Sequence, residues 1–329
     1  MLAFLVQRLF QAVLVMLAVA VIAFALFNYV GDPISSMVGQ DTSVADRERL
    51  RQELGLDDSF IVQFARFVGR AARGNFGLSY QQARPVGQII LEKMPATLEL
   101  SFVAATLALI IGVPMGIYTG LHRDTWLSQL LLAVSLVGVS LPTFLIGILL
   151  ILVFAVMLGW LPSFGRGSVV HFGWWRSSGL VTLDGWRAII MPAVTLSLFQ
   201  MTLIMRLVRA EMFEVLRTVY IKFARARGLT NRTVNFGHAL KNTLVPVITI
   251  AGLQLGSIIA FAIITETVFQ WPGMGLMFIQ AVSFADIPVM AAYLVLVGFF
   301  FVVINLVVDL LYHAVDPRLR MDRERVGVG

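Results

Sequence analysis

The chain has 329 residues and no cysteine, which excludes a disulfide framework, a zinc–thiolate site and a cysteine nucleophile. Charge is also scarce, because only 13% of the residues are Asp, Glu, Lys or Arg, against about 25% in soluble domains. Hydrophobic residues make up 58% of the chain. This composition excludes an ordinary soluble globular domain.

Several catalytic motifs are missing as well. The sequence has no G-x4-G-K-[ST] loop to hold nucleotide phosphates, no G-x-S-x-G turn to present a serine, and no H-E-x-x-H pair to bind zinc. The four histidines are far apart in the sequence. We therefore expect a chain that is not an enzyme and holds no metal or cofactor of its own, so that any use of ATP depends on a partner.

The charged residues leave six windows empty, each near or above the roughly 18 apolar residues that a helix needs to cross a bilayer. They predict an all-α polytopic membrane protein with six transmembrane helices. The windows are 9–31, 100–122, 125–165, 188–205, 242–265 and 287–308. The first is too long for a secretory signal, so we expect it to be retained. The expected spans are about 1–30, 98–121, 128–158, 188–208, 243–266 and 288–312.

Basic residues indicate how these spans are oriented. With the N-terminus inside, four inner segments hold 14 of the 25 Lys and Arg residues, whereas the two short outer loops hold only 3. Because inner loops carry the excess of positive charge, both termini are expected to be cytoplasmic. We attribute the net charge of +6 to this topology and not to nucleic-acid binding. The inner segments are 1–8, 122–127, 206–243 and 313–329, and the outer loops are 159–187 and 267–288.

The outer segment 31–95 is expected to contain two short helices. One is capped by Ser43 and stops at Gly55, and the other starts after Ser59 and ends at Gly74. The second helix presents an apolar stripe, which can pack on the outer ends of the spans or dock an extracytoplasmic partner, and both can hold. The stripe consists of Phe60, Ile61, Phe64, Phe67 and Val68.

Small residues one turn apart occur in two spans. In lipid, such residues let helix backbones approach closely, either within one chain or against a second membrane subunit. Pro114 and Pro142 are expected to kink the second and third spans. The small residues are Gly112, Gly116 and Gly120 in the second span, and Gly252 and Gly256 in the fifth.

Charged residues lie at the ends of the spans, which argues against a proton- or sodium-driven carrier. Of these residues, Glu266 and Asp309 are expected to cap a helix or pair with another charge. The segment 267–285 carries no charge but is interrupted by Trp271, Pro272, Gly273 and Gly275, so we expect an outward loop with a short interfacial helix. Five tryptophans are expected at the outer boundary or in outer loops, namely Trp160, Trp174, Trp175, Trp186 and Trp271.

The inner segment 206–241 carries eight basic and two acidic residues, and its residues 220–228 read as a short amphipathic helix that ends at a glycine. The segment can be a solvated basic loop, but its length and apolar stripe favour a helix that fits a groove on another protein. The face expected to be shared consists of Tyr220, Phe223, Ala224 and Arg227.

These residues resemble a known family. The run 220–229, followed by 238–242, is similar to the coupling loop of membrane subunits in binding-protein-dependent ABC importers. Of the general signature E-A-A-x3-G-x9-I-x-L-P, only Ala224, Gly228 and Leu240 keep the consensus, in the form that the dipeptide/oligopeptide/nickel branch uses. Further stretches resemble the first permease subunit of that branch, including 31–33, 53–57, 74–79, 95–98, 266–275, 286–289 and 305–318.

The resemblance implies a type I ABC importer permease fold, with a coupling loop at 209–242, a transmembrane domain over 96–316 and a cytoplasmic tail at 317–329. It also implies the bacterial inner membrane, a second homologous permease, two ATPase subunits that bind ATP and Mg, and a periplasmic substrate-binding protein. Gly228 is expected to end the coupling helix in a backbone geometry that alanine resists, and Ala224 to let the helix lie close to its groove. The residues expected to couple to the ATPase are Tyr220, Phe223, Ala224, Arg225, Arg227, Gly228, His238 and Leu240.

The function implied is ATP-driven import of dipeptides or short peptides. Oligopeptides, glutathione, nickel or another small solute remain alternatives within the same machinery, because selection depends largely on the binding protein. An alternative from a different class is a stand-alone secondary carrier.

Overall fold

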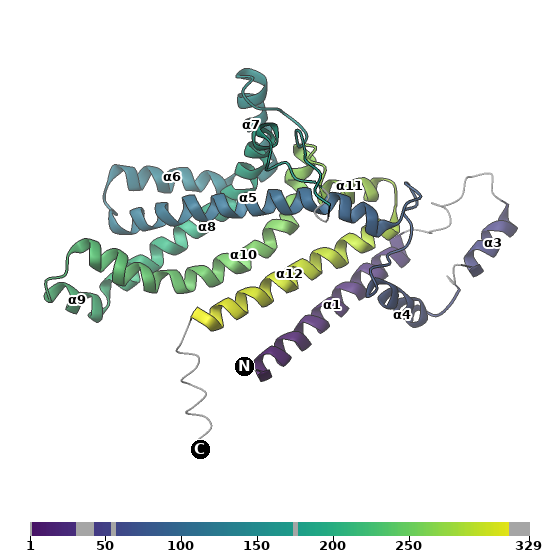
Figure 1. Cartoon of the computed structure of the whole chain (residues 1–329), viewed down its shortest axis with the longest axis horizontal. Coiled ribbons are helices and arrows are strands. Elements are labelled where there is room, and N and C mark those ends of the chain that lie inside the picture. Colours follow the sequence, from purple (N-terminus) through teal and green to yellow (C-terminus); the bar gives the residue numbers. More distant parts are fainter. Residues whose placement is uncertain (1, 31–42, 54–56, 174–176, 316–329) are drawn as a thin grey trace, which may run out of the picture.

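The structure is a computed structural model that describes residues 2–30, 43–53, 57–173 and 177–315. Figure 1 shows α5, α6, α8 and α10 gathered in one bundle, with α12 and then α1 beside it, α9 at one end, and α3 and α4 towards the other. The helices are α1 (Leu2–Val30), α3 (Val44–Glu53), α4 (Phe60–Ala71), α5 (Val86–Leu121), α6 (Trp126–Ser140), α7 (Thr143–Leu150) with its π-helical continuation η1 (Ile151–Met157), α8 (Leu183–Arg217), α9 (Val219–Ala226), the π-helix η2 (Thr233–Ala239), α10 (Leu240–Val268), α11 (Met274–Ser283) and α12 (Ile287–Val315).

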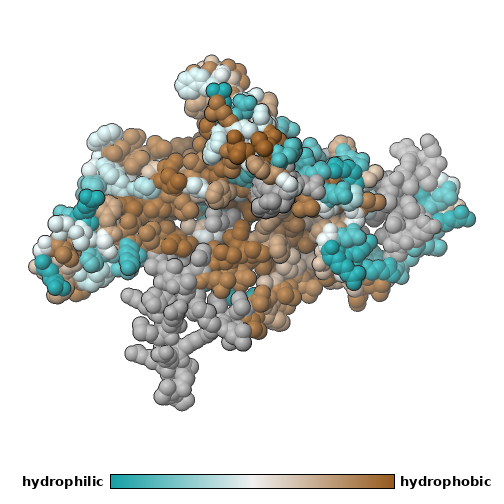
Figure 2. Space-filling view, in the orientation of Figure 1, coloured by the Kyte–Doolittle hydropathy of each residue, from teal (hydrophilic) through white to brown (hydrophobic). Residues whose placement is uncertain are grey.

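Four of these helices, α1, α5, α8 and α12, are long and apolar enough to cross a membrane, and the number rises to six if each of two bent helix pairs forms one span. In Figure 2, hydrophobic residues cover the middle of the visible face, whereas hydrophilic residues gather at the α9 end and near α3 and α4. An apolar belt between two polar ends is the surface that a bilayer requires. Gly55, Trp174, Trp175 and the tail 317–329 lie outside the described residues.

The third expected span, 128–158, is not a single kinked helix. It is divided into α6 and the helix formed by α7 and η1, which meet at an angle of 109°. Leu141 has an extended backbone and Pro142 begins the next helix, because proline disfavours a helical conformation in the residue before it. The position of the bend was therefore correctly expected, but its size was not. At Pro114, by contrast, α5 continues as one helix.

The outer segment contains the two expected helices. Ser43 caps α3, since its hydroxyl oxygen accepts a hydrogen bond from the Asp46 amide at 3.2 Å. The apolar stripe of α4 packs on α1, where Phe24 lies 5.1–5.7 Å, between ring centroids, from Phe60, Phe64 and Phe67. The apolar stripe therefore packs on a span, which is the first of its two expected roles. Ile61, which also belongs to the stripe, is 77% exposed.

The glycines of the second span lie against α8 of the same chain. A Cβ atom on Gly112 or Gly116 would come within 2.9 Å and 2.7 Å of a backbone oxygen of α8, and Gly120 faces the same helix. Gly252 and Gly256 of α10 lie in the same way against side chains of α12. These contacts correspond to the intrachain alternative for both glycine patterns.

Gly116→Leu is expected to destabilise the subunit by about 1–3 kcal/mol, because the added side chain would force α5 away from the backbone of α8. The thermal unfolding midpoint of the purified protein in detergent measures this effect. Gly69→Leu is the matched control, since Gly69 is also helical but has no atom within 4 Å of its Cβ position. Equal midpoints for the two variants would contradict the close packing of α5 on α8.

Candidate functional site

The helix α9 projects from the end of the bundle where α8 and α10 meet (Figure 1). Thr218 separates α8 from α9 with an extended backbone. Two residues of α9, Ile221 and Ala224, are 0% and 8% exposed and pack in a cluster with Met212 of α8 and Ala239 of η2. The expected loop 209–242 is therefore mostly helical, and α9 is fixed on the bundle by its inner face.

The outer face of α9 is exposed. Phe223 is 63% exposed and Val219 is 80% exposed, and the Arg225 and Arg227 side chains also lie at the surface. Tyr220 is partly held, because its hydroxyl accepts a hydrogen bond from Asn242 Nδ2 at 2.6 Å. A large exposed aromatic flanked by arginines is typical of residues that dominate binding energy in protein interfaces.

Gly228 ends α9 with a φ of +79°, a conformation that L residues rarely adopt. Its amide donates to the Arg225 carbonyl at 3.0 Å, and the Leu229 amide donates to Ala224 at 3.4 Å. No atom of the described chain lies within 4 Å of a Cβ placed on Gly228. The expected backbone geometry is thus present, and a side chain added here would point away from the bundle.

The prediction that four residues share one face of α9 is wrong for Ala224. Ala224 lies on the inner face beside Ile221, while Tyr220, Phe223 and Arg227 lie outside. Sequence reasoning missed Ile221, the most buried residue of the helix, because the aromatic residues gave the stronger apolar pattern. Leu240 likewise packs in the inner cluster, whereas His238 is exposed. Ala224 and Leu240 therefore belong to the packed inner side of this segment.

Basic residues lie on α9 and at the end of α8 that leads into it, where Glu211 and Glu214 also lie. The guanidinium groups of Arg123 and Arg217 lie 4.3 Å and 3.7 Å from the ring centroid of Phe213, in the last turns of α8. Arg227 lies 5.7 Å from the ring of Phe223. Such a surface favours a partner with acidic residues.

At the opposite end, Glu266 holds α11 against α5. Its carboxylate is fully buried and accepts hydrogen bonds from the amides of Gly275 and Leu276 at 2.7 Å and 3.0 Å, and from the Thr97 hydroxyl at 2.6 Å. Glu266 thus caps α11, as expected from its position. A side chain on Gly273 or Gly275 would collide with this carboxylate, so both positions need glycine.

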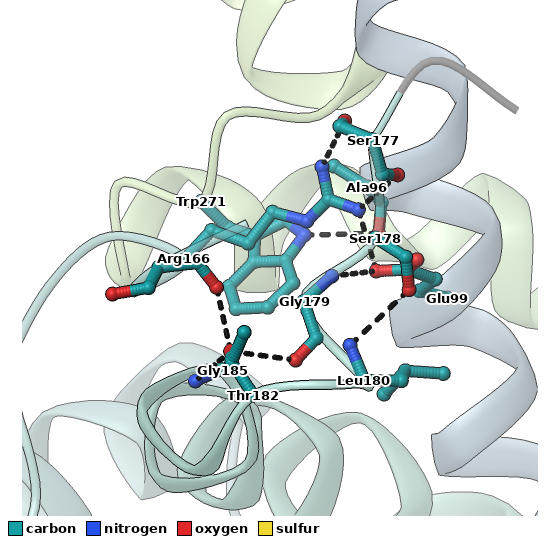
Figure 3. A network of polar contacts seen from close by, with 11 residues as sticks. Ala96, Glu99, Arg166, Ser177, Ser178, Gly179, Leu180, Thr182, Gly185 and Trp271 are labelled. Atoms are coloured by element: carbon teal, nitrogen blue, oxygen red, sulfur yellow. Dashed lines mark hydrogen bonds and ion pairs between the residues drawn. The ribbon is translucent and has the colours of Figure 1, made fainter. Parts of the chain in front are cut away.

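Trp271 lies in the loop between α10 and α11, but it does not face the surface. It is fully buried, and its indole nitrogen donates to the Ala96 carbonyl of α5 at 2.9 Å (Figure 3). Its ring belongs to the buried cluster that includes Leu100 and Ala262. Trp160 and Trp186 are 65% and 45% exposed.

A buried ion pair fastens the loop after η1 to α5. Arg166 Nη2 lies 2.5 Å from Glu99 Oε2, and the two side chains are only 6% and 5% exposed. Arg166 also donates to the hydroxyl and carbonyl of Ser177 at 2.9 Å and 3.1 Å (Figure 3). Sequence reasoning placed Glu99 at a span end but could not name its partner, which is 67 residues away.

Asp286 makes a second fastening point, which sequence reasoning did not single out. Its carboxylate is buried and accepts hydrogen bonds from the Ser79 hydroxyl and from the amides of Tyr80 and Gln81 at 3.1 Å and 3.3 Å. Burial and the nearby Asp286 charge raise the pKa of the Tyr80 hydroxyl. The start of α12 and the loop before α5 are thereby joined.

Two further polar contacts join helices of the bundle. Asp309 of α12 pairs with Arg8 of α1 at 3.0 Å, as the expectation of a charge partner required. Between α8 and α10, Gln200 donates to the Ser257 hydroxyl at 3.1 Å. Over the described ranges, no three acidic, histidine or cysteine residues gather in a way that could hold a metal ion.

Comparison with known proteins gives matches over nearly the whole chain. A family model described as binding-protein-dependent transport system inner membrane component matches residues 112–321, and the model of the N-terminal part of such components matches residues 1–101. A probable D,D-dipeptide transport system permease protein of Escherichia coli (strain K12) is 38% identical, with 95% of this chain and 96% of that protein covered.

Two further matches agree. A glutathione transport system permease protein of Escherichia coli O1:K1 / APEC is 35% identical, with 97% of this chain and 99% of that protein covered. Among solved structures, a chain of the MetNI methionine ABC transporter in an inward-facing conformation superposes with a TM-score of 0.54 at 19% identity, covering 70% of this chain and 97% of the other. The protein therefore belongs to the binding-protein-dependent transport system inner membrane components and has the type I ABC importer permease fold.

Proposed function

We propose that this chain is the permease subunit of an ABC importer for dipeptides or short peptides. It forms half of the translocation path beside a second, homologous permease. Two ATPase subunits bind at the α9 end and supply ATP and Mg, and a periplasmic binding protein delivers substrate at the end that carries α11. The chain itself performs no catalysis.

The observation that carries the proposal is the exposed face of α9. Phe223 and Arg227 lie outside on a helix whose inner face is fixed in the bundle, and the space beyond Gly228 is open. A short helix held in this way suits a groove on a separate protein. When ATP draws the two ATPases together, the paired α9 helices approach each other and the bundles rock, so that the path opens outward.

The proposed orientation follows from charge. The α9 end is basic, and inner loops carry the excess of Lys and Arg, so we place this end and both termini in the cytoplasm of a bacterial inner membrane. The polar end near α3 and α4 then lies in the periplasm, where the binding protein docks.

The substrate is proposed from the relatives. A permease for a D,D-dipeptide and one for glutathione, itself a short peptide, resemble this chain over almost their full lengths. Oligopeptides, nickel or another small solute are the other outcomes of the test. Mass spectrometry of the ligand that co-purifies with the cognate binding protein distinguishes them.

Reconstitution in liposomes tests the transport role. Uptake of a radiolabelled dipeptide is expected only when the second permease, both ATPases, the loaded binding protein and ATP are all present, because the sequence contains no P-loop motif. Replacing ATP with a non-hydrolysable analogue is the control and should stop turnover. Uptake by this chain alone would identify a secondary carrier and refute the proposal.

A further inference from the structure

An apolar groove of about 690 Å³ runs between α1 and α12. Its walls extend from Leu9 to Ala20 on α1 and from Val295 to Leu306 on α12, and Phe67 and Val68 of α4 line it as well. Each wall is 12 residues long, which corresponds to about 17 Å at a rise of 1.5 Å per residue. This length matches one leaflet of a hydrocarbon core that is about 30 Å thick.

A second hollow adjoins the groove at its α4 end. This hollow of about 600 Å³ shares Gly74 and Phe76 with the groove and is lined by Arg70 and by the start of α5. Arg70 is exposed, and its side chain makes neither a hydrogen bond nor an ion pair within the part of the chain that the structure describes. At the other end of the groove, by contrast, Arg8 is neutralised by Asp309.

An apolar channel of leaflet length with one unpaired cation at its polar end has the shape and charge of a phospholipid site. A protein segment is a poor occupant, because the apolar walls would leave its backbone groups without partners unless it were already helical. We propose that the groove binds one phospholipid, with an acyl chain between α1 and α12 and its phosphate at Arg70.

Photo-crosslinking of the assembled transporter tests this site. The probe is phosphatidylglycerol with a diazirine on its acyl chain, in nanodiscs of equal parts phosphatidylethanolamine and phosphatidylglycerol. Crosslinks are expected to concentrate on peptides that contain residues 9–20 and 295–306. Arg70→Gln is expected to reduce them about fivefold, the effect of removing one basic contact to an anionic lipid.

Two matched controls separate the site from general lipid contact. Arg73→Gln removes the same charge three residues away, outside both cavities, and is expected to leave labelling unchanged. Ala12→Phe fills the groove and should abolish labelling, whereas Ala18→Phe, on an exposed position outside the groove, should not.

Three results would overturn the proposal. The first is equal labelling of the groove and of the exposed face of α6, which would indicate only annular lipid. The second is an equal effect of Arg70→Gln and Arg73→Gln. The third is labelling that occurs in the isolated chain but disappears on assembly, which would show that the second permease covers the groove.

Discussion

Gly228→Asp is expected to abolish ATP-dependent uptake while the subunit remains inserted in the membrane. The substitution places a carboxylate and a side chain beyond the end of α9, where no atom of the described chain lies within 4 Å. It also forces an L residue to a φ of +79°, which costs about 1–2 kcal/mol. Uptake into proteoliposomes and co-purification of the ATPases measure the loss.

Two variants separate strain from docking. Gly228→Asn adds a side chain of similar size that meets the same φ about as well as Asp does but carries no charge, so it should retain part of the uptake. Gly159→Asp introduces the same residue at a φ of +64°, also with no atom within 4 Å of the Cβ position, in the loop after η1. Loss of ATPase binding in Gly159→Asp, or normal uptake in Gly228→Asp, would remove α9 from the proposed role.

Arg166→Met is expected to destabilise the protein by about 3–5 kcal/mol. It leaves the Glu99 carboxylate buried with no cation beside it, and removing one member of a buried pair is far more harmful than removing both. The loop after η1 would also lose its bonds to Ser177. The thermal unfolding midpoint in detergent and the yield of monodisperse protein report the effect.

The double variant Glu99→Gln with Arg166→Met is the decisive control. It removes both charges but keeps a carbonyl oxygen near the Gly179 amide, which lies 3.4 Å from Glu99 Oε2. Most of the lost stability should return. If the double variant unfolds as readily as Arg166→Met, the loss arises from packing and not from an unpaired buried charge.

Local features of the sequence predicted much of the fold. Three features could be predicted because each depends on residues that are close in the chain. They are the Ser43 cap, the spacing of the glycines in α5 and the position of the bend at Pro142. The bend angle of 109° did not follow, because proline only disfavours the helical state of Leu141 and the packing of α7 sets the new direction.

Contacts between distant residues could not be predicted in this way. Trp271 sits in a segment that looks like an exposed turn, and only its bond to Ala96, 175 residues away, explains its burial. The inward position of Ala224 has the same origin, since the cluster that receives it is built by α8, η2 and α10. The sequence therefore predicted where the candidate coupling surface lies but not which of its residues face outward.

The burial of Ile221 and Ala224 has a mechanical consequence. A helix on a flexible linker would move alone when a neighbouring protein displaced it. The helix α9, by contrast, packs in the same core as α8 and α10. A displacement imposed on α9 would therefore be transmitted directly to α8 and α10. The rigidity of the contact between α9 and the bundle would then determine how much of a movement at one side of the membrane reaches the other side. The affinity of the outer face of α9 for a partner would matter less.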